Sequence, residues 1–211
     1  MIPVNSEPST PPHDQPDSPG GMASPPGGLL VVKVGGGLLA EPGGLEKVGW
    51  ALSSAGTRRR LVVIPGGGPF ANLVREFDRA HGLSPSAAHW MAILGMDQYA
   101  HALADYTPRA RVVDDQAGIL GALDGGRVPI LAPFRWLSAA DELPHSWDVT
   151  SDSLAAYLAT LLGAEELVLV KPVGGGEELV DPYFRRALAA GMRWRVVGAG
   201  EESLERALAG Q

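Results

Sequence analysis

The chain has 211 residues, of which 45% are apolar and 19% are charged, with a formal net charge of −7 and no cysteine. The absence of cysteine excludes a disulfide framework, a Cys-ligated zinc site and a thiol nucleophile, so the fold must rest on a buried core. With 17 basic against 24 acidic residues we expect no nucleic-acid partner. The sequence has no run of 18 apolar residues and no signal pattern, so we expect a cytoplasmic protein that is not bound to a membrane.

The first 28 residues differ in composition from the rest of the chain. They contain eight Pro, four Gly and four Ser and lack Lys, Arg, Leu and Phe. Such a segment cannot bury enough apolar surface to offset its ordering entropy, so residues 1–28 are predicted to be a disordered tail. The remainder, residues 29–211, fits one domain or two small lobes that share a sheet.

Beyond the tail, short apolar runs alternate with amphipathic helical patterns. The runs predict strands at Leu29 to Val34, Leu61 to Ile64, Val128 to Leu131, Leu167 to Val170 and Arg195 to Val197. The patterns between them predict helices at about 44–55, 69–81, 85–105, 115–123, 151–163, 183–190 and 201–209. Strands that are apolar on both faces and separated by helices are typical of an α/β protein with a mainly parallel sheet covered on both sides. Ligands of such folds bind beyond the carboxyl ends of the strands.

Glycine triplets follow the first two predicted strands, at Gly35, Gly36 and Gly37 and at Gly66, Gly67 and Gly68. Without a Cβ these turns expose backbone N–H groups, and the helix that follows adds partial positive charge. Tight strand-to-helix turns also use glycine for geometry alone, so one triplet is weak evidence. Two triplets in equivalent positions favour a phosphate site.

Two of the three lysines end predicted strands directly before glycine-rich turns. Lys33 precedes the first triplet, and Lys171 precedes Pro172, Val173 and a third run of glycines that begins at Gly174. A lysine at a strand end can simply extend its ammonium group into water. Beside a backbone anion cradle, however, an ammonium has an obvious partner in a phosphoryl group.

Asp152 opens the amphipathic helix predicted at 151–163. Negative charge in the first turn of a helix is favourable by itself, so helix capping is a sufficient reading of this residue. The functional alternative is that Asp152 anchors Lys33 and Lys171 at the spacing that a transferring phosphoryl group needs.

Other site motifs are missing. The sequence contains no GxxxxGK[ST], HExxH or GxSxG pattern, and its five histidines show no paired ligand spacing. No metal site built from protein side chains is predicted.

The order of these blocks resembles the amino acid kinase superfamily. Four blocks carry the resemblance: Lys33 to Gly36, Ile64 to Gly68, Asp148 to Ala155 and Leu167 to Gly175. Three further stretches are similar to the branch that contains the kinase of methanofuran biosynthesis: Ala88 to Tyr99, Trp147 to Ser153 and Val180 to Phe184.

The resemblance implies a three-layer αβα sandwich. It implies that the half at about 29–140 binds the acceptor and that the half at about 141–211 binds ATP, with Mg²⁺ held through the ATP phosphates. Carried onto this chain, Lys33 and Lys171 would contact the transferring phosphoryl group and Asp152 would orient them. The backbone N–H donors to phosphates would come from Gly35, Gly36, Gly67 and Gly68. In addition, Lys171, Gly174 and Gly175 would contact the nucleotide, and Gly66 would line the acceptor site.

The third turn departs from the family, because relatives usually carry an Asp-Val-Asp-Gly type sequence where this chain reads Lys171-Pro172-Val173-Gly174-Gly175. The lost acids favour an alternative reading, a non-catalytic nucleotide or oxyanion binder, whereas the retained lysines and Asp152 favour catalysis. A kinase with a carboxylate acceptor is a further alternative.

The expected acceptor is a small-molecule phosphate, for example an aminomethylfuran-methyl phosphate of methanofuran-type one-carbon cofactor biosynthesis. Such an acceptor would also carry an amine, with which Asp97 or Asp148 could pair. A solvated acid on a helix face and a capping acid are the alternative readings of these two residues. We also expect a homo-oligomer.

Overall fold

A computed structural model describes residues 28–40 and 42–209. Apart from Gly28, the predicted tail at residues 1–28 lies outside this part of the chain. The described strands form one parallel sheet of order β3-β4-β2-β1-β5-β6. Their bounds are β1 Leu30–Val34, β2 Leu61–Pro65, β3 Ala110–Val113, β4 Val128–Leu131, β5 Glu166–Lys171 and β6 Arg193–Gly198.

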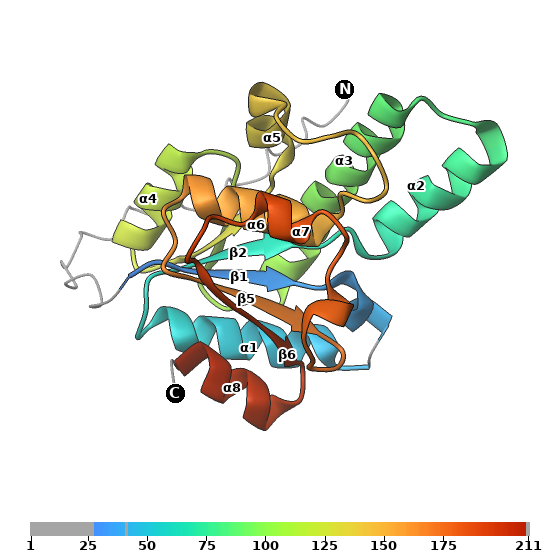
Figure 1. Cartoon of the computed structure of the whole chain (residues 1–211). Coiled ribbons are helices and arrows are strands. Elements are labelled where there is room, and N and C mark those ends of the chain that lie inside the picture. The colour runs from blue at the N-terminus through green and yellow to red at the C-terminus, as the bar shows by residue number, and fades with distance from the viewer. Residues whose placement is uncertain (1–27, 41, 210–211) are drawn as a thin grey trace, which may run out of the picture.

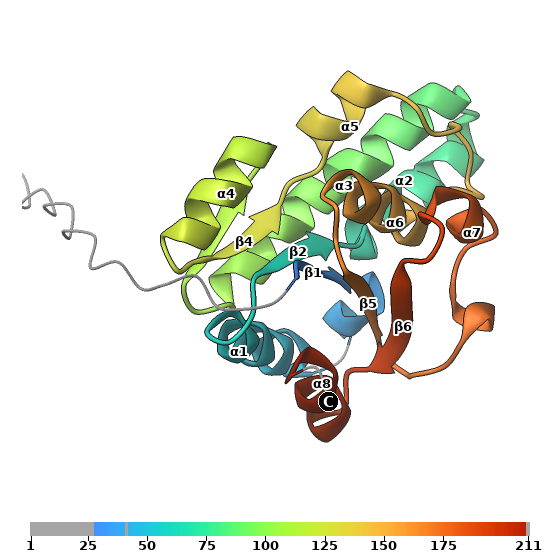
Figure 2. The ribbon, with the colours of Figure 1, turned by 60° about the vertical axis from the view of Figure 1, so that its left-hand side comes forward.

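Helices cover both faces of this sheet, as Figures 1 and 2 show. The helices α1 and α8 lie side by side on one face, while α6 and α7 pack together on the other. The predicted αβα architecture is therefore confirmed. The helices are η1 Gly36–Ala40, α1 Gly44–Gly56, α2 Gly68–His81, α3 Pro85–Asp105, α4 Gln116–Asp124, α5 Phe134–Ala140, α6 Ser151–Leu161, η2 Glu177–Leu179, α7 Phe184–Ala187 and α8 Glu201–Ala209.

The central strands are buried on both faces because their side chains alternate between two cores. Along β1, Leu30, Val32 and Val34 pack with α1 and α8. Val31 points the other way and packs with the core beneath α6. Such strands read as continuous apolar runs, which is why the sequence revealed them.

Besides the short 3-10 helices η1 and η2, which were not predicted, one strand and two α-helices differ from the sequence-based expectation. The edge strand β3 was missed because its four residues, Ala-Arg-Val-Val, form a short run interrupted by a charge. The seven-residue α5 was also missed. The helix predicted at 183–190 is wrong in length: α7 spans only Phe184–Ala187 and ends where Leu188 adopts an extended backbone.

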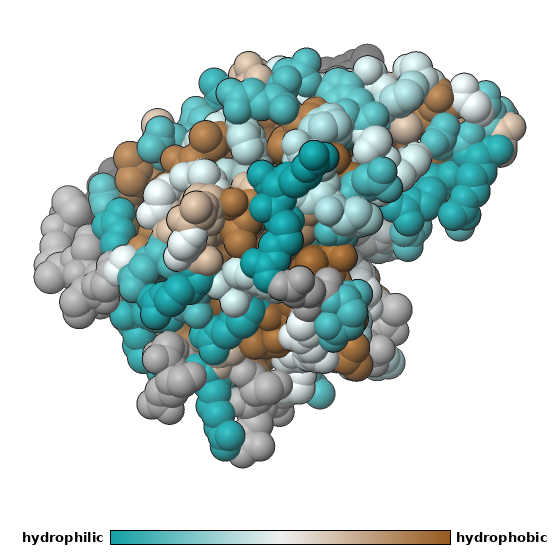
Figure 3. Space-filling view, viewed as in Figure 1, coloured by the Kyte–Doolittle hydropathy of each residue, from teal (hydrophilic) through white to brown (hydrophobic). Residues whose placement is uncertain are grey.

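The helices α2 and α3 pack against each other as an arm at one end of the sheet (Figure 1). Figure 3 shows hydrophilic residues gathered over the outer end of this arm. The inner end of α2 starts at the second glycine turn, so this helix connects the turn to the outer part of the arm.

Candidate active site

The two lysines that the sequence singled out lie on the same face of the sheet. Lys33 lies within β1, and Lys171 is the last residue of the neighbouring strand β5. Since side chains alternate along a strand, Lys33 shares the face of Val31. Lys171 likewise shares the face of Leu169, and both apolar residues belong to the core beneath α6. The topology thus directs both ammonium groups toward α6.

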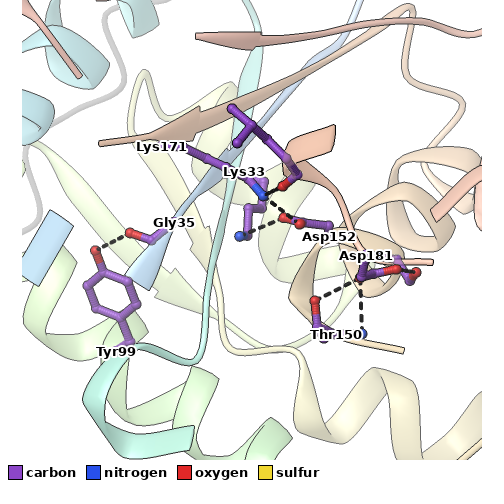
Figure 4. Close-up of polar contacts among 9 residues, drawn as sticks. Lys33, Gly35, Tyr99, Thr150, Asp152, Lys171 and Asp181 are labelled. Atoms are coloured by element: carbon purple, nitrogen blue, oxygen red, sulfur yellow. Dashed lines mark hydrogen bonds and ion pairs between the residues drawn. The ribbon is translucent and has the colours of Figure 1, made fainter. Parts of the chain in front are cut away.

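Asp152, in the first turn of α6, lies between the two lysines (Figure 4). Lys33 Nζ is 2.8 Å from Asp152 Oδ1, and Lys171 Nζ is 2.7 Å from Asp152 Oδ2. The side chains of Lys33 and Asp152 are only 5% and 6% exposed, and that of Lys171 is 17% exposed. We call these three residues the transfer cluster. Because two ammonium groups share one carboxylate, the cluster has a surplus positive charge that favours an anionic ligand.

The lysines also determine the protonation state of Asp152. Burial alone would raise the pKa of this carboxyl group, but the charge of Lys33 and hydrogen bonds from both lysines outweigh burial. The pKa of Asp152 therefore lies below its ordinary value of 3.8. Asp152 is ionised at neutral pH and is suited to orienting the lysines rather than to accepting a proton.

A second carboxylate, that of Asp181, holds the first turn of α6 (Figure 4). Its Oδ2 accepts hydrogen bonds from Thr150 N at 3.0 Å, Thr150 Oγ1 at 2.7 Å and Ser153 N at 3.0 Å. Its Oδ1 accepts hydrogen bonds from Ser153 Oγ and Tyr183 N. Because the Thr150 side chain makes no capping bond to the helix itself, Asp181 satisfies a helix N–H that a cap residue usually covers. Thr150 and Ser153 flank Asp152, so Asp181 also fixes the backbone that carries Asp152.

The first two glycine turns meet at the carboxyl ends of β1 and β2. A Cβ on Gly36 would lie 2.2 Å from Gly68 Cα, so only glycine fits at this contact. The N–H groups of Gly36, Gly67 and Gly68 have no hydrogen-bond acceptor among residues 28–40 and 42–209. Two of them lie at the N-terminus of α2, where unsatisfied N–H groups and the helix dipole attract anions. These three N–H groups can therefore bind phosphate oxygens.

The first glycine of each triplet has a different task. Gly35 N donates to Val170 O at 2.7 Å, and Gly66 N donates to Val34 O at 2.8 Å. Both bonds extend the parallel sheet, so the prediction that Gly35 donates an N–H to a phosphate is wrong, and Gly66 has no free N–H to offer. The carbonyl of Gly35 accepts a hydrogen bond from the buried Tyr99 Oη at 3.4 Å, which holds the turn from below (Figure 4).

A cavity of about 770 Å³ opens beside these turns. The glycines at the starts of η1 and α2 form one end, and the walls come from α2, α3, the loop before α6 and the first turns of α6. We call this cavity the acceptor pocket, after the acceptor site that the family resemblance predicts at the second glycine turn. It is lined by Gly36, Gly37, Leu39, Gly67, Gly68, Pro69, Ala71, Asn72, Arg75, Asp78, Leu83, Pro85, Ala88, His89, Ala92, Ile93, Met96, His145, Ser146, Trp147, Val149, Thr150, Ser151 and Leu154.

One wall of the acceptor pocket was not foreseen from the sequence. Trp147 Nε1 donates to Asp78 Oδ2 at 2.8 Å, and the guanidinium carbon of Arg75 lies 4.6 Å from the centroid of the Trp147 ring. We call Arg75, Asp78 and Trp147 the acceptor wall. The available signal was the spacing of three residues from Asn72 to Arg75 and from Arg75 to Asp78, which places these side chains on one helical face. Nothing in the sequence pairs that face with Trp147.

The two carboxylates predicted to pair with an acceptor amine lie elsewhere. Asp97 Oδ1 accepts a hydrogen bond from Phe134 N at 3.0 Å at the start of α5, and burial raises the pKa of Asp97. Asp148 is exposed. Neither residue lines the acceptor pocket, so the structure does not bring either of them to it, and the pairing of one of them with an acceptor amine stays a prediction. The carboxylate that does line the pocket belongs to Asp78.

Comparison with known proteins then decides the family. The sequence profile of the amino acid kinase family matches residues 28–175. This chain belongs to the amino acid kinase family.

Two curated members of that family have kinase activity in their names. [5-(Aminomethyl)furan-3-yl]methyl phosphate kinase of Methanocaldococcus jannaschii is 34% identical over 149 residues, which cover 70% of this chain and 67% of that protein. Acetylglutamate kinase of a Synechococcus species is 36% identical over 66 residues, 31% of this chain and 19% of that protein. Like these members of the amino acid kinase family, the chain is a phosphotransferase.

Solved structures of the same family share the fold. Uridylate kinase from Archaeoglobus fulgidus superposes with a TM-score of 0.64 at 17% identity, covering 86% of this chain and 96% of that one. UMP kinase from Ureaplasma parvum superposes with a TM-score of 0.61 at 14% identity, covering 86% of this chain and 94% of that one. At such low identity the likeness concerns the αβα fold alone.

The third glycine turn is the part at which the sequence analysis noted a departure from the family pattern. Gly174 and Gly175 are exposed and lie outside the lining of the acceptor pocket. Gly175 forms an antiparallel bridge with Val196, and a Cβ on Gly174 would lie 3.0 Å from Gly198 N. These glycines thus let the turn pack closely on β6, and their contact with a nucleotide stays a prediction. Beyond this turn, the carbonyl of Leu179 accepts a hydrogen bond from Lys171 Nζ.

Two further findings concern the part of the chain that the structure describes. It contains no group of three or more His, Asp or Glu side chains that could hold a metal ion. None of its helices is long and apolar enough to cross a membrane. The cytoplasmic location stays a prediction.

Proposed function

We propose that this family member transfers the γ-phosphoryl group of ATP to the phosphate of a small phosphomonoester. The surplus positive charge of the transfer cluster carries this proposal, because the buried Lys33 and Asp152 and the partly buried Lys171 lie beside two glycine turns with free N–H groups. Phosphoryl transfer passes through a loose, in-line transition state that asks the protein mainly for positioning and charge neutralisation. The lysines supply the charge neutralisation, and Asp152 and the glycine N–H groups supply the positioning.

Each residue has a defined task in this reaction. Lys33 and Lys171 neutralise charge on the oxygens of the transferring group, and Asp152 holds their ammonium groups at a fixed separation. The N–H groups of Gly36 and Gly68 bind phosphate oxygens at the end of the acceptor pocket. Because these groups are held by the fold before the ligands bind, little reorganisation is needed during the reaction.

On this proposal Mg-ATP binds on the side of the transfer cluster away from the acceptor pocket. Lys171 ends β5 and is the most exposed member of the cluster, so it is the residue that would contact the nucleotide phosphates. Mg²⁺ would be bound through the ATP phosphates, whose charge it would reduce. Gly174 and Gly175 in the turn after Lys171 would support the nucleotide.

A phosphate acceptor requires no general base, because its oxygen is already ionised near neutral pH. Two imidazoles line the acceptor pocket, and that of His89 is a poor base. Burial and the neighbouring charge of His145 lower the pKa of His89 to about 4, against a smaller opposing effect of Asp141. The pocket therefore suits an acceptor that arrives deprotonated better than one that has an alcohol to activate.

For the acceptor we propose an aminomethylfuran-methyl phosphate. The relative from Methanocaldococcus jannaschii, whose name contains this compound, is similar over 70% of the chain. That match supports the same acceptor class here.

Product analysis tests the proposed function. The purified protein is incubated with Mg-ATP and a panel of acceptors: [5-(aminomethyl)furan-3-yl]methyl phosphate, other phosphomonoesters, carbamate, aspartate and acetylglutamate. ADP release is measured, and ³¹P NMR identifies the product. We expect a diphosphate ester from the phosphomonoester. ADP release with a carboxylate or carbamate alone, or nucleotide binding without transfer to any acceptor, would overturn the proposal.

We also propose that the protein forms a homo-oligomer. The helices α2 and α3 expose four large apolar side chains, Leu73, Phe77, Met91 and Leu94, which are 37% to 67% accessible. Exposed apolar side chains can be covered at an interface between copies of a chain. Light scattering coupled to size exclusion tests this expectation, and a monomer at micromolar concentration would contradict it.

A further inference from the structure

The acceptor pocket contains a single side chain with a permanent positive charge. The described residues that line it include no lysine and one arginine, Arg75. Its guanidinium group has no carboxylate within ion-pair distance in residues 28–40 and 42–209. A half-buried guanidinium that faces a cavity without a counterion is suited to binding an anion.

The position of Arg75 on α2 directs it toward the phosphate-binding N–H groups. Arg75 follows Gly68 by seven residues, which is two helical turns, so both residues lie on the same face of α2 about 10 Å apart along the axis. Long side chains in helices lean toward the N-terminus, which shortens this separation. An anion bound at the start of α2 would therefore lie on the side toward which Arg75 extends.

Neutral contacts hold the guanidinium in place. Arg75 stacks 4.6 Å from the ring centroid of Trp147, whose Nε1 donates to Asp78 Oδ2. Asp78 Oδ1 in turn accepts a hydrogen bond from Leu83 N at 2.9 Å. Asp78 thus fixes the indole and the indole orients the guanidinium, while the charge of Arg75 is left for a ligand.

Building on the proposed function, we propose that Arg75 binds the phosphate of the acceptor. It is then the residue by which the acceptor pocket recognises a phosphomonoester dianion, with Trp147 and Asp78 as positioning residues. The transfer cluster would act on the group in transfer, and Arg75 on the group that receives it.

Binding measurements separate phosphate recognition from every other contact. Isothermal titration calorimetry without ATP compares [5-(aminomethyl)furan-3-yl]methyl phosphate with the corresponding alcohol, which lacks the phosphate. We expect Arg75→Gln to weaken binding of the phosphate about 10- to 100-fold, because a charge-assisted hydrogen bond is lost, and to leave binding of the alcohol unchanged. Steady-state kinetics should show the same increase in the acceptor KM, with the ATP KM within about twofold of wild type.

Two further variants complete the test. Arg79→Gln removes an exposed arginine one turn later on α2, outside the pocket lining, and should behave as wild type. Arg75→Lys retains the charge but loses the planar fork, so it should lie between wild type and Arg75→Gln. If wild type turns over the phosphomonoester and both Arg75 variants bind it as tightly as wild type, this inference alone is overturned. If wild type neither binds nor phosphorylates any phosphomonoester, the proposed function falls together with it.

Discussion

The transfer cluster and the acceptor wall hold their charges in opposite ways. In the transfer cluster Lys33 and Asp152 are buried, Lys171 is partly buried, and Asp152 pairs with the two lysines at 2.8 and 2.7 Å. In the acceptor wall Arg75 and Asp78 are half-buried, and each contacts neutral partners: an indole face, an indole N–H and a backbone N–H. The first arrangement fixes geometry whether or not a ligand is present. The second leaves charge available for the ligand.

This difference indicates a division of labour between rate and recognition. Buried charges that are locked together can stabilise a transition state without rearrangement, so changes there should affect turnover. Charges held by neutral groups contribute when a ligand supplies the counterion, so changes there should affect acceptor affinity. The experiments below test this division from the largest expected effect to the smallest.

The largest effect is expected from Asp152→Asn. This change leaves the buried ammonium group of Lys33 and the partly buried one of Lys171 without their carboxylate, and breaking a buried ion pair typically costs about 3–5 kcal/mol of folding free energy. Urea denaturation should show this loss, and ADP release should be nearly abolished. Asp148→Asn, on the exposed loop before the same helix, serves as the control and should retain both properties. Wild-type stability of Asp152→Asn would contradict the assignment of the buried cluster.

Removing either lysine should separate activity from stability. We expect Lys33→Met and Lys171→Met to lower kcat about 10²- to 10³-fold, which corresponds to about 3–4 kcal/mol of transition-state stabilisation. The free energy of unfolding should not fall with kcat, because the remaining lysine and Asp152 form a balanced pair. Lys47→Met, at an exposed position of α1, is the matched control. Turnover at the wild-type rate in either cluster variant would remove that lysine from the mechanism.

Asp181→Asn tests whether the clamp on α6 acts through Asp152. The variant keeps the shape of the side chain but replaces one acceptor oxygen with an amide donor, so part of the five hydrogen bonds to Thr150, Ser153 and Tyr183 is lost. We expect a stability loss of about 1–2 kcal/mol, as for a lost helix cap, and a fall in kcat with little change in the acceptor KM. A change confined to melting temperature, with kcat as in wild type, would reduce Asp181 to a structural cap.

The pH dependence of stability provides a smaller effect. Because the folded-state pKa of His89 is lowered to about 4 from 6.5, the folded protein binds a proton less readily than the unfolded chain does. The contribution of neutral His89 is therefore complete above pH 6.5 and decreases as the pH falls toward 4. His89→Gln should flatten the stability profile in this window. Below it, loss of the ionised form of Asp152 should lower stability further in both proteins, since the pKa of Asp152 is also lowered. An unchanged slope in His89→Gln would contradict this origin.

The smallest effect is expected from Trp147→Phe. Phenylalanine keeps an aromatic face for Arg75 but loses the Nε1 hydrogen bond to Asp78, a contribution of about 1 kcal/mol. The acceptor KM should therefore rise only a few-fold while kcat stays near wild type. An equal fall in kcat, measured with saturating acceptor, would contradict the division between recognition and rate.

Most of the fold could be predicted from local patterns. All five strands predicted from apolar runs are present in the parallel sheet. The strand β3 was not predicted, because Arg111 interrupts a run of only four residues. The transfer cluster was also within reach, because period-two alternation and the strand ends put Lys33 and Lys171 at one edge of a parallel sheet. Asp152 was a candidate anchor for both lysines because it opens the helix predicted at 151–163, with helix capping as the alternative.

Contacts between distant segments could not be predicted in the same way. Nothing in the sequence singled out Asp78, and only packing showed that its carboxylate faces the acceptor pocket. Asp181 reaches back about thirty residues to Thr150, and no short pattern indicates such a bond.

The sequence alone determined the layers of the protein, the strand ends at which chemistry occurs and the two lysines there, because these follow from periodicities of two and 3.6 residues within single elements. Only the tertiary structure decided which glycine N–H groups can bind a ligand, since those of Gly35 and Gly66 donate hydrogen bonds to carbonyl groups of the neighbouring strands. It also decided that Arg75 and Trp147 share a wall, because that contact depends on how α2 and the loop before α6 pack against each other.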